Sequence, residues 1–566
     1  MTTPHRHRPA LPTVDPRRLL VLARRSQQAL LIAGVTGAAT GLAVAGFERL
    51  TFDGLFGTVL DLPVALQAVA PTVGLVLAFA CLRFVGRGAS PATSDEYIRA
   101  FHDQGRRMDL RAVPGRLLAA AATLGGGVPL GYEGPSLYAG AAIGSALQRR
   151  LQRYFTVDES KLLLVAGAAA GVAAIFKAPV TGLVFALEVP YQEDLARRML
   201  LPAAISAAAA YVTFAAFAGT EPILPVGGQA PFNLVDLGGA AVVGLAAGVL
   251  ARAFIALIHL AKRWSTKGRP LVRAVLGGGV LAATVVLGYV LADRPLTLGP
   301  GYNALRWALD PRRSVLGIVA LGTLRVVGTA AAIFGGAVGG LFIPLVIQGA
   351  LVGRAVGGIF DPGNATLFPV VGMAAFLGAG YRVPLASVVF VAEFTGRPGF
   401  VVPGLIAAVV AQLVMGRASI SPYQVAGRVG HLEKRLSLPL ATLVDAAAHT
   451  VPPDATAEEL FWQHMVGTRQ RSVAVVDGSS YVGMVRAEDL AKVDRDAWPT
   501  TMVTEVMRTD LPVAAPTWTV ADAIRAMEAA DADRLAMCDD GRFAGMITAE
   551  DIVRLDDILR ETSRSE

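Results

Sequence analysis

Glu133 is the residue of this chain whose surroundings most clearly suggest chemistry. It lies in Gly131-Tyr132-Glu133-Gly134-Pro135, a stretch rich in Gly and Pro within a strongly apolar region. Proline favours the first turn of a helix, and glycine lets the backbone approach a ligand closely. The stretch therefore predicts a carboxylate at a helix start, where unpaired backbone N–H groups attract negative charge.

A second copy of this pattern lies 209 residues downstream. The matching residues are Arg116, Gly126, Gly127, Gly131, Pro135, Gly140 and Gly144 in the first copy and Arg325, Gly335, Gly336, Gly340, Pro344, Gly349 and Gly353 in the second. Phe342 takes the place of Glu133, within Gly340-Leu341-Phe342-Ile343-Pro344. Interrupted apolar segments in corresponding halves of a membrane protein indicate an ion or substrate site between the repeats.

Two further segments match at an offset of 205 residues. FKAPVTGLVFALE, which ends at Glu188, corresponds to YRVPLASVVFVAE, which ends at Glu393. The second residue of each is basic and comes two positions before a proline, Lys177 in the first and Arg382 in the second. We expect Glu188 and Glu393 to be structural groups that cap or brace helix ends.

The elements that must hold these residues are membrane-spanning helices. The 566 residues are 54% hydrophobic and 17% charged, and the mean hydropathy is +0.52. A soluble chain has about 25% charged residues. Residues 236–261 and 271–291 are each long enough to cross a bilayer, whereas shorter Gly-rich runs predict helices that stop inside the membrane.

Residues 1–26 form a basic tail before the first apolar run. Its arginines include Arg6, Arg8, Arg17, Arg18, Arg24 and Arg25. By the positive-inside rule this tail is cytoplasmic. Together with the apolar runs that follow it, the tail predicts a multi-pass protein of the cell (inner) membrane. The net charge of +7 is modest for this length and is explained by basic cytoplasmic loops, so we expect no nucleic-acid partner.

The apolar character ends near Gly416, and residues 426–435 form a basic linker to a polar region. That region contains its own repeat, in which Gly483-Met484 and Ala487-Glu488-Asp489 match Gly545-Met546 and Ala549-Glu550-Asp551. Residues 436–494 and 500–562 each predict strands and helices in alternation. The two units resemble a tandem pair of cystathionine-β-synthase (CBS) domains, an α/β fold on the cytoplasmic side.

Residues 27–425 resemble the chloride channel (CLC) family of anion channels and anion/proton antiporters, in its prokaryotic type with a C-terminal CBS pair. GYEGP, FKAPVTGLVFALE, GGLFIP and SISPYQ carry the resemblance. It implies an all-α polytopic membrane protein with two inverted repeats, about 30–218 and 236–425, of broken, tilted helices. It also implies a homodimer in membrane lipid with one pore per subunit, chloride as substrate and no required cofactor.

The resemblance implies a role for each residue of these motifs. Glu133 would be a gate that competes with the anion until protonation or chloride displaces it. The anion-binding residues would be Gly131, Gly134, Pro135, Gly340, Leu341, Phe342, Ile343, Tyr423 and Ser90. The family's serine loop reads GSGIP, whereas this chain has GRGASP followed by Ala-Thr-Ser. Ser90 is therefore the candidate hydroxyl, with Thr93 and Ser94 as alternatives.

Val189 bears on the mode of transport. In antiporters of this family a proton-relaying glutamate follows the residue that aligns with Glu188, whereas family channels have valine there. Val189 cannot carry a proton, which favours a passive channel, although Glu193 or water could substitute.

In the CBS pair, Thr548 and Asp551 resemble an element that binds the phosphate and ribose of adenine nucleotides. The first unit has Arg486 in place of the hydroxyl residue. The pair therefore has at most one such site, and the alternative is that it binds no ligand.

The sequence favours a passive chloride channel gated by Glu133, which the CBS pair could modulate. The first alternative is a chloride/proton antiporter of the same fold. Remoter alternatives are a CBS-based membrane sensor with a vestigial pore and a CBS-bearing magnesium channel. We expect no enzyme and no metal site, because the sequence has no nucleophile–base or metal-ligand cluster.

Overall fold

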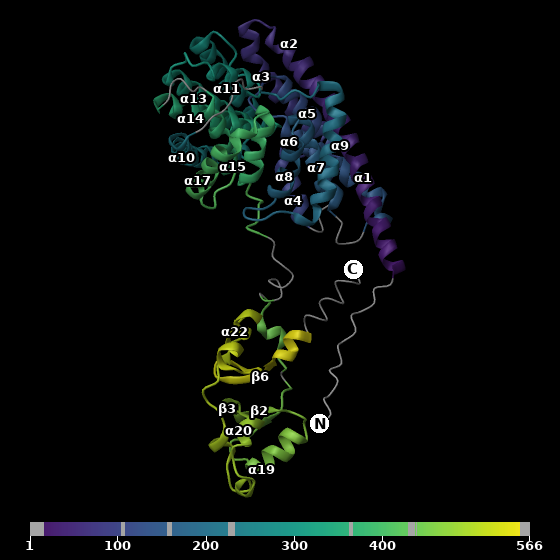
Figure 1. The fold of residues 1–566 in the computed structure, drawn as a ribbon, viewed down its shortest axis with the longest axis vertical. Helices are drawn as coiled ribbons and strands as arrows, with labels where there is room; N and C mark the ends of the chain where they lie inside the picture. Colours follow the sequence, from purple (N-terminus) through teal and green to yellow (C-terminus); the bar gives the residue numbers. More distant parts are fainter. Residues whose placement is uncertain are drawn as a thin grey trace, which may run out of the picture. The chain divides into compact units, whose positions relative to one another are not determined.

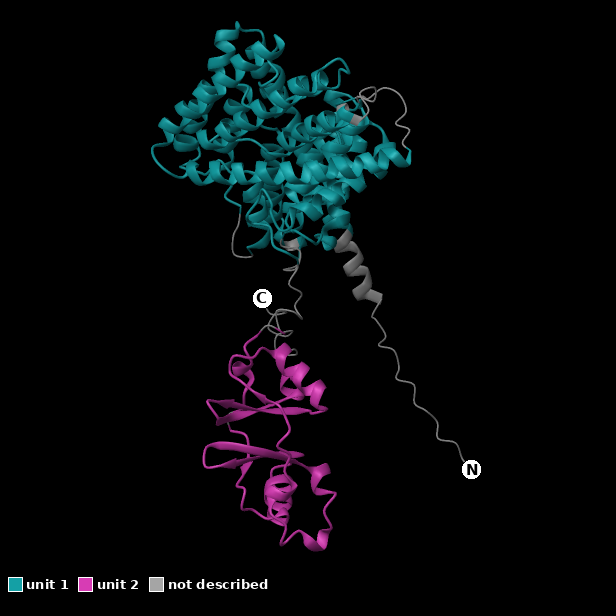
Figure 2. Cartoon of the chain, turned by 90° about the vertical axis from the view of Figure 1, so that its left-hand side faces the viewer, with its two compact units in different colours: residues 1–427 teal, residues 428–566 magenta. Residues whose placement is uncertain are grey.

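The computed structural model describes residues 16–103, 108–155, 161–224, 233–360, 366–427, 436, 438–445 and 447–554. The chain divides into two compact units, residues 1–427 and 428–566 (Figure 2). The described part of unit 1 is helical, and the strands lie in unit 2 (Figure 1). Residues 1–15 of the predicted tail and 428–435 of the predicted linker lie outside the described residues.

The first repeat of unit 1 runs from α1 to α9. Its elements are α1 (Pro16–Glu48), η1 (Arg49–Phe56), α2 (Gly57–Leu60), α3 (Val64–Ala80), η2 (Cys81–Val85), α4 (Ser94–His102), α5 (Val113–Gly125), α6 (Glu133–Arg150), η3 (Gln152–Tyr154), α7 (Leu162–Phe176), α8 (Pro179–Glu188), η5 (Arg197–Met199) and α9 (Leu200–Ala218).

The second repeat follows the same order. Its elements are α10 (Leu234–Ser265), α11 (Pro270–Ala292), α12 (Tyr302–Ala308), α13 (Val315–Gly335), α14 (Phe342–Phe360), α15 (Leu367–Tyr381), α16 (Pro384–Thr395), η6 (Pro398–Phe400) and α17 (Val401–Met415).

Long and short apolar helices are mixed in unit 1, as predicted. Among the described residues, seven helices are long and apolar enough to cross a membrane, two of them Leu234–Ser265 and Pro270–Ala292. Five apolar helices are shorter, between 10 and 17 residues. Such helices end within the protein, where their unpaired backbone groups can line a site.

The two repeats pack alike. Helix α6 packs against α7 as α14 packs against α15, and α1 against α9 as α10 against α17 (Figure 1). Glycines permit the closest approaches: a Cβ on Gly140 would lie 2.0 Å from the Gly167 oxygen, and one on Gly349 would lie 2.2 Å from the Gly372 oxygen. Small residues at helix crossings are typical of packing inside membranes.

Unit 2 contains a six-stranded sheet in the order β1-β2-β3-β6-β5-β4. Within each half one strand pair is parallel and one antiparallel, which agrees with the predicted repeat. The elements are η7 (Leu440–Leu443), β1 (Thr450–Val451), α19 (Ala457–Glu459), η8 (Leu460–Val466), β2 (Ser472–Asp477), β3 (Ser480–Arg486), α20 (Ala487–Leu490), η9 (Arg495–Ala497), α21 (Val503–Val506), β4 (Val513–Ala514), α22 (Val520–Ala530), β5 (Arg534–Asp539) and β6 (Arg542–Thr548).

Candidate functional site

The site is built where two helices begin. Helix α6 starts at Glu133 and helix α14 at Phe342. Just before them, the Gly131 amide donates to the Gly340 oxygen at 2.9 Å, and the Gly340 amide donates to the Gly131 oxygen at 2.8 Å. These two hydrogen bonds hold the N-termini of α6 and α14 together. The unpaired N–H groups and positive dipole ends of both helices therefore face one region.

The Glu133 carboxylate fills that region. Its Oε1 accepts a hydrogen bond from the Phe342 amide at 2.7 Å, and the side chain is buried. Its Oε2 has no hydrogen-bond partner among the described residues. A Cβ on Gly131 or Gly340 would lie within 2 Å of a carboxylate oxygen. The glycines therefore leave the space that the carboxylate occupies, at a helix start suited to an anion.

Phe342 contributes its backbone to the site and its ring to the core. The ring is fully buried and packs against Phe176, Phe185 and Phe390 at centroid distances of 4.7, 5.2 and 4.8 Å. This aromatic cluster fixes the first turn of α14, so the Phe342 amide keeps its direction toward Glu133.

The other predicted residues of the two motifs lie beside this pair. Gly134 and Pro135 are buried in the first turn of α6, and Ile343 is buried in the first turn of α14. Leu341 and Gly340 line an adjacent pocket of about 220 Å³. The structure thus brings together the predicted residues of the GYEGP and GLFIP motifs.

Ser90 lies outside this group, and its role as an anion ligand stays a prediction. Its side chain is exposed, and its Oγ and backbone oxygen accept hydrogen bonds from the Arg116 guanidinium at 3.2 and 3.0 Å. Arg116 is buried and needs these acceptors. The alternatives Thr93 and Ser94 line the pocket, and a Cβ on Gly134 would lie 2.6 Å from the Thr93 Oγ1.

Tyr423 also lies elsewhere. Its side chain is 42% exposed, and the Arg99 guanidinium stacks over its ring at 5.0 Å. The next residue, Gln424, is buried, and its Nε2 donates to the backbone oxygens of Val189, Tyr191 and Tyr381. Because Gln424 anchors this segment, the neighbouring Tyr423 side chain does not reach the site.

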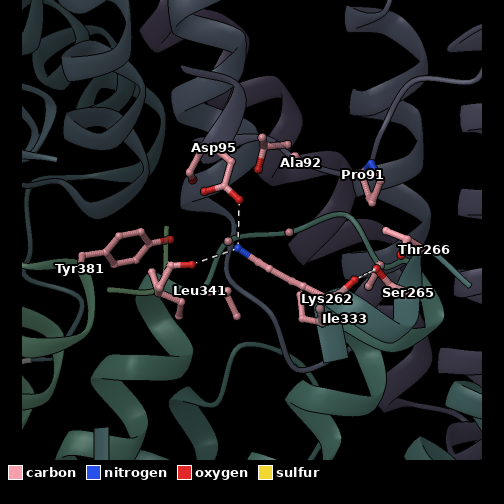
Figure 3. Close-up of a pocket in the computed structure, with 15 residues that line it drawn as sticks. Pro91, Ala92, Asp95, Lys262, Ser265, Thr266, Ile333, Leu341 and Tyr381 are labelled. Carbon is pink, nitrogen blue, oxygen red and sulfur yellow. Dashed lines mark hydrogen bonds and ion pairs between the residues drawn. The ribbon is translucent and has the colours of Figure 1, made fainter. Parts of the chain in front are cut away.

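Tyr381 is the functional candidate that the sequence analysis missed. It ends α15, is buried, lines the pocket with Leu341, and packs against Phe185 at 5.6 Å. In Figure 3 the hydroxyl points toward the middle of the pocket. A signal was present, because Tyr381 opens the repeated segment YRVPLASVVFVAE.

Val189 lies at the C-cap of α8 and is buried. The preceding Glu188 accepts hydrogen bonds from the Leu385 and Ala386 amides at 3.2 and 2.9 Å. Glu193 pairs with Arg382 at 3.3 Å, and its side chain is 65% exposed. Glu188 is thus a helix cap, as predicted, whereas Glu193 is a surface acid.

In unit 2 the predicted nucleotide residues bond to each other. Asp551 Oδ2 accepts from the Thr548 amide at 3.0 Å and from the Thr548 hydroxyl at 2.6 Å. A cleft of about 820 Å³ lies next to them, lined by Arg471, Arg486 and Ala549 among others. Nucleotide binding stays a prediction.

Among the described residues, no group of three acidic, His or Cys side chains could hold a metal ion.

Family models match most of the chain. The voltage gated chloride channel family matches residues 73–416, and the CBS domain matches 443–496 and 503–557. A putative chloride channel protein ClcB-like of Ralstonia nicotianae is 27% identical over 67% of this chain and 92% of its own length. The H(+)/Cl(-) exchange transporter ClcA of Citrobacter koseri is 29% identical over 70% of this chain and 87% of its own length.

Solved structures agree on the fold. A slow cyanobacterial Cl-/H+ antiporter has a TM-score of 0.61 and 21% identity, and it covers 68% of this chain and 94% of its own. A eukaryotic CLC transporter has a TM-score of 0.58 and 18% identity, and it covers 94% of this chain and 98% of its own. The chain therefore belongs to the voltage gated chloride channel family, transports chloride across a membrane and carries a C-terminal pair of CBS domains.

Proposed function

We propose that this protein exchanges chloride for protons and that Glu133 serves both ions. The main support is the position of the Glu133 carboxylate between two helix starts, where it accepts a hydrogen bond from the Phe342 amide at 2.7 Å. An anion bound there would need the same amide. The named exchangers among the relatives support exchange at least as well as the passive channel that the sequence favoured.

The chemistry is a competition for one set of donors. When Glu133 is ionised, its carboxylate occupies the anion position. When it is protonated or displaced, chloride can take the amides of Leu341, Phe342 and Ile343, together with the Tyr381 hydroxyl. Backbone dipoles and hydroxyls bind an anion weakly enough for release, which transport requires. When the Glu133 side chain leaves the anion position in its protonated form, it carries one proton with it.

A passive channel is the second candidate. Val189 favours it, because a buried valine offers no titratable group where antiporters of this family have glutamate. A proton that crosses the low-dielectric part of a membrane protein needs acids or waters. For exchange, the proton must therefore reach Glu133 through water or through another acid.

Proteoliposomes under a chloride gradient separate the two candidates. Chloride and proton fluxes are recorded together, with a protonophore added at the end to calibrate the pH signal. Exchange predicts proton movement against its own gradient, driven by chloride. A channel predicts chloride flux with a reversal potential set by chloride alone, and this result would reject the proposed exchange.

We also propose a homodimer with one pore per subunit in the cell membrane, with the N-terminus and the CBS pair cytoplasmic. The family resemblance and the basic tail support this arrangement. We propose further that the CBS pair modulates transport, with an adenine nucleotide as its candidate ligand. Chemical crosslinking in vesicles tests the dimer, and nucleotide titration of the purified chain tests the ligand.

A further inference from the structure

The pocket beside the Glu133 site contains a charged pair outside the predicted motifs. Lys262, in the last turn of α10, donates to Asp95 Oδ2 at 2.9 Å and to the Ile420 backbone oxygen at 3.1 Å. The Lys262 side chain is 29% exposed and the Asp95 side chain 17%. Figure 3 shows Lys262 reaching across the pocket to Asp95. The ion pair therefore lies inside the pocket wall.

The pocket connects this pair with the anion position. Its lining includes Lys262 and Asp95 together with Gly340, Leu341 and Tyr381. Gly340 closely approaches the Glu133 carboxylate, because a Cβ there would lie 1.9 Å from Oε1. An anion that moves through this pocket toward Glu133 must pass the field of both charges.

We propose that Lys262 recruits the transported anion into this pocket. Asp95 limits the affinity of Lys262 for the anion, because its carboxylate competes for the same ammonium group. An ammonium has three donors, and its two contacts described above leave one for an anion. The paired carboxylate keeps the local charge near zero, so an anion is attracted without being trapped. This inference rests on chloride transport and does not require proton coupling.

A purely structural role makes a different prediction. The pair joins α4 of the first repeat to α10 of the second, so a structural link would be weakened equally by loss of either partner. Under the recruitment role, the two losses have opposite effects on chloride. Asp95→Asn leaves an unbalanced cation in the pocket, whereas Lys262→Met leaves an unbalanced carboxylate that repels anions.

The test measures chloride flux against chloride concentration in proteoliposomes of the full chain. Lys262→Met should raise the half-maximal concentration about tenfold, Asp95→Asn should lower it severalfold, and the double variant should lie between them. Lys262→Arg should stay near wild type. Lys267→Met is the matched control, because Lys267 is exposed beyond α10 over the Trp264 ring.

The proposal is overturned if both single variants shift the concentration in the same direction, or if neither shifts it while both reconstitute as folded protein. Calorimetric titration of bromide into detergent-solubilised protein supplies a second readout for a variant with low flux, with the same expected order of affinities. Missing proton coupling with shifted chloride dependence would defeat the proposed exchange alone. Intact coupling with unshifted chloride dependence would defeat the recruitment role alone.

Discussion

The Glu133 carboxylate accepts a hydrogen bond from the amide of Phe342, the residue at its equivalent position in the second repeat. The two residues are 209 positions apart, which is the offset of the repeat itself. Gly131 and Gly340, also equivalent, exchange backbone hydrogen bonds in both directions. Reciprocal bonds between equivalent residues place a pseudo-two-fold axis at this point, so the Glu133 carboxylate lies where the two repeats meet.

Glu188 and Glu393 extend this symmetry. Glu188 of α8 accepts from the amides that begin α16, and Glu393 of α16 accepts from the Val180 and Thr181 amides that begin α8. Each carboxylate thus satisfies the free N–H groups of the partner helix. These hydrogen bonds join α8 of the first repeat to α16 of the second in both directions.

Removing one of these caps should destabilise unit 1. Glu393→Ala leaves three donors of the α8 start without their acceptor, including the Thr181 hydroxyl at 2.6 Å. We expect a loss of about 2–3 kcal/mol in unfolding free energy. Thermal unfolding in detergent measures it, with exposed Glu221→Ala as control. An unchanged midpoint for Glu393→Ala would contradict the capping role.

Tyr381, rather than Tyr423, should contribute the hydroxyl for the anion. Tyr381→Phe removes that donor from the pocket and should raise the half-maximal chloride concentration about tenfold. Tyr423→Phe should leave it unchanged, because Tyr423 stacks on Arg99 at the surface. Concentration-dependent flux in vesicles compares the two. The reverse order of effects would restore Tyr423 to the site.

Asp489 should make the stability of unit 2 depend on acid pH. Burial alone would raise the pKa of Asp489, but hydrogen bonds from Lys492 and Arg486 outweigh burial and hold it below its ordinary value. A depressed pKa stabilises the fold at neutral pH, and this contribution is lost as pH falls below about 4. Hydrogen exchange of residues 487–493 in the full chain should report the loss.

Asp489→Asn is the control for this pH effect. The variant should be less stable at neutral pH and should show a weaker response between neutral and acid pH in the same segment. An Asp489→Asn protein that keeps the full acid response would assign the effect to another carboxylate.

The Glu133 site could be predicted from sequence because its geometry depends on local features. Glycine and proline fix where α6 and α14 begin, and the repeat places both starts in equivalent positions. The helix starts also explain why Phe342 acts through its amide. The pairing of Glu133 with Phe342 follows from these constraints.

Tyr423, Ser90 and Lys262 could not be placed from the sequence, since tertiary contacts direct them. Gln424 turns the segment of Tyr423 by binding carbonyls far away in sequence, and buried Arg116 takes Ser90 as its acceptor. Lys262 and Asp95 are 167 positions apart and belong to different repeats. Side-chain directions in irregular segments depend on such distant partners, so the local sequence does not predict these directions.

The most direct test of the account is the pH dependence of chloride flux in Glu133→Gln. Glutamine keeps the shape of the protonated side chain but cannot ionise, so it cannot hold the anion position as a carboxylate. Glu133→Ala, which removes the competing group, should behave in the same way. Chloride flux is measured in proteoliposomes at a series of external pH values, with wild type in parallel.

We predict that both variants conduct chloride at a rate independent of pH and without uphill proton movement, while wild type responds to pH. If both variants keep the wild-type pH response, the Glu133 carboxylate is not the group that links protons to the anion path.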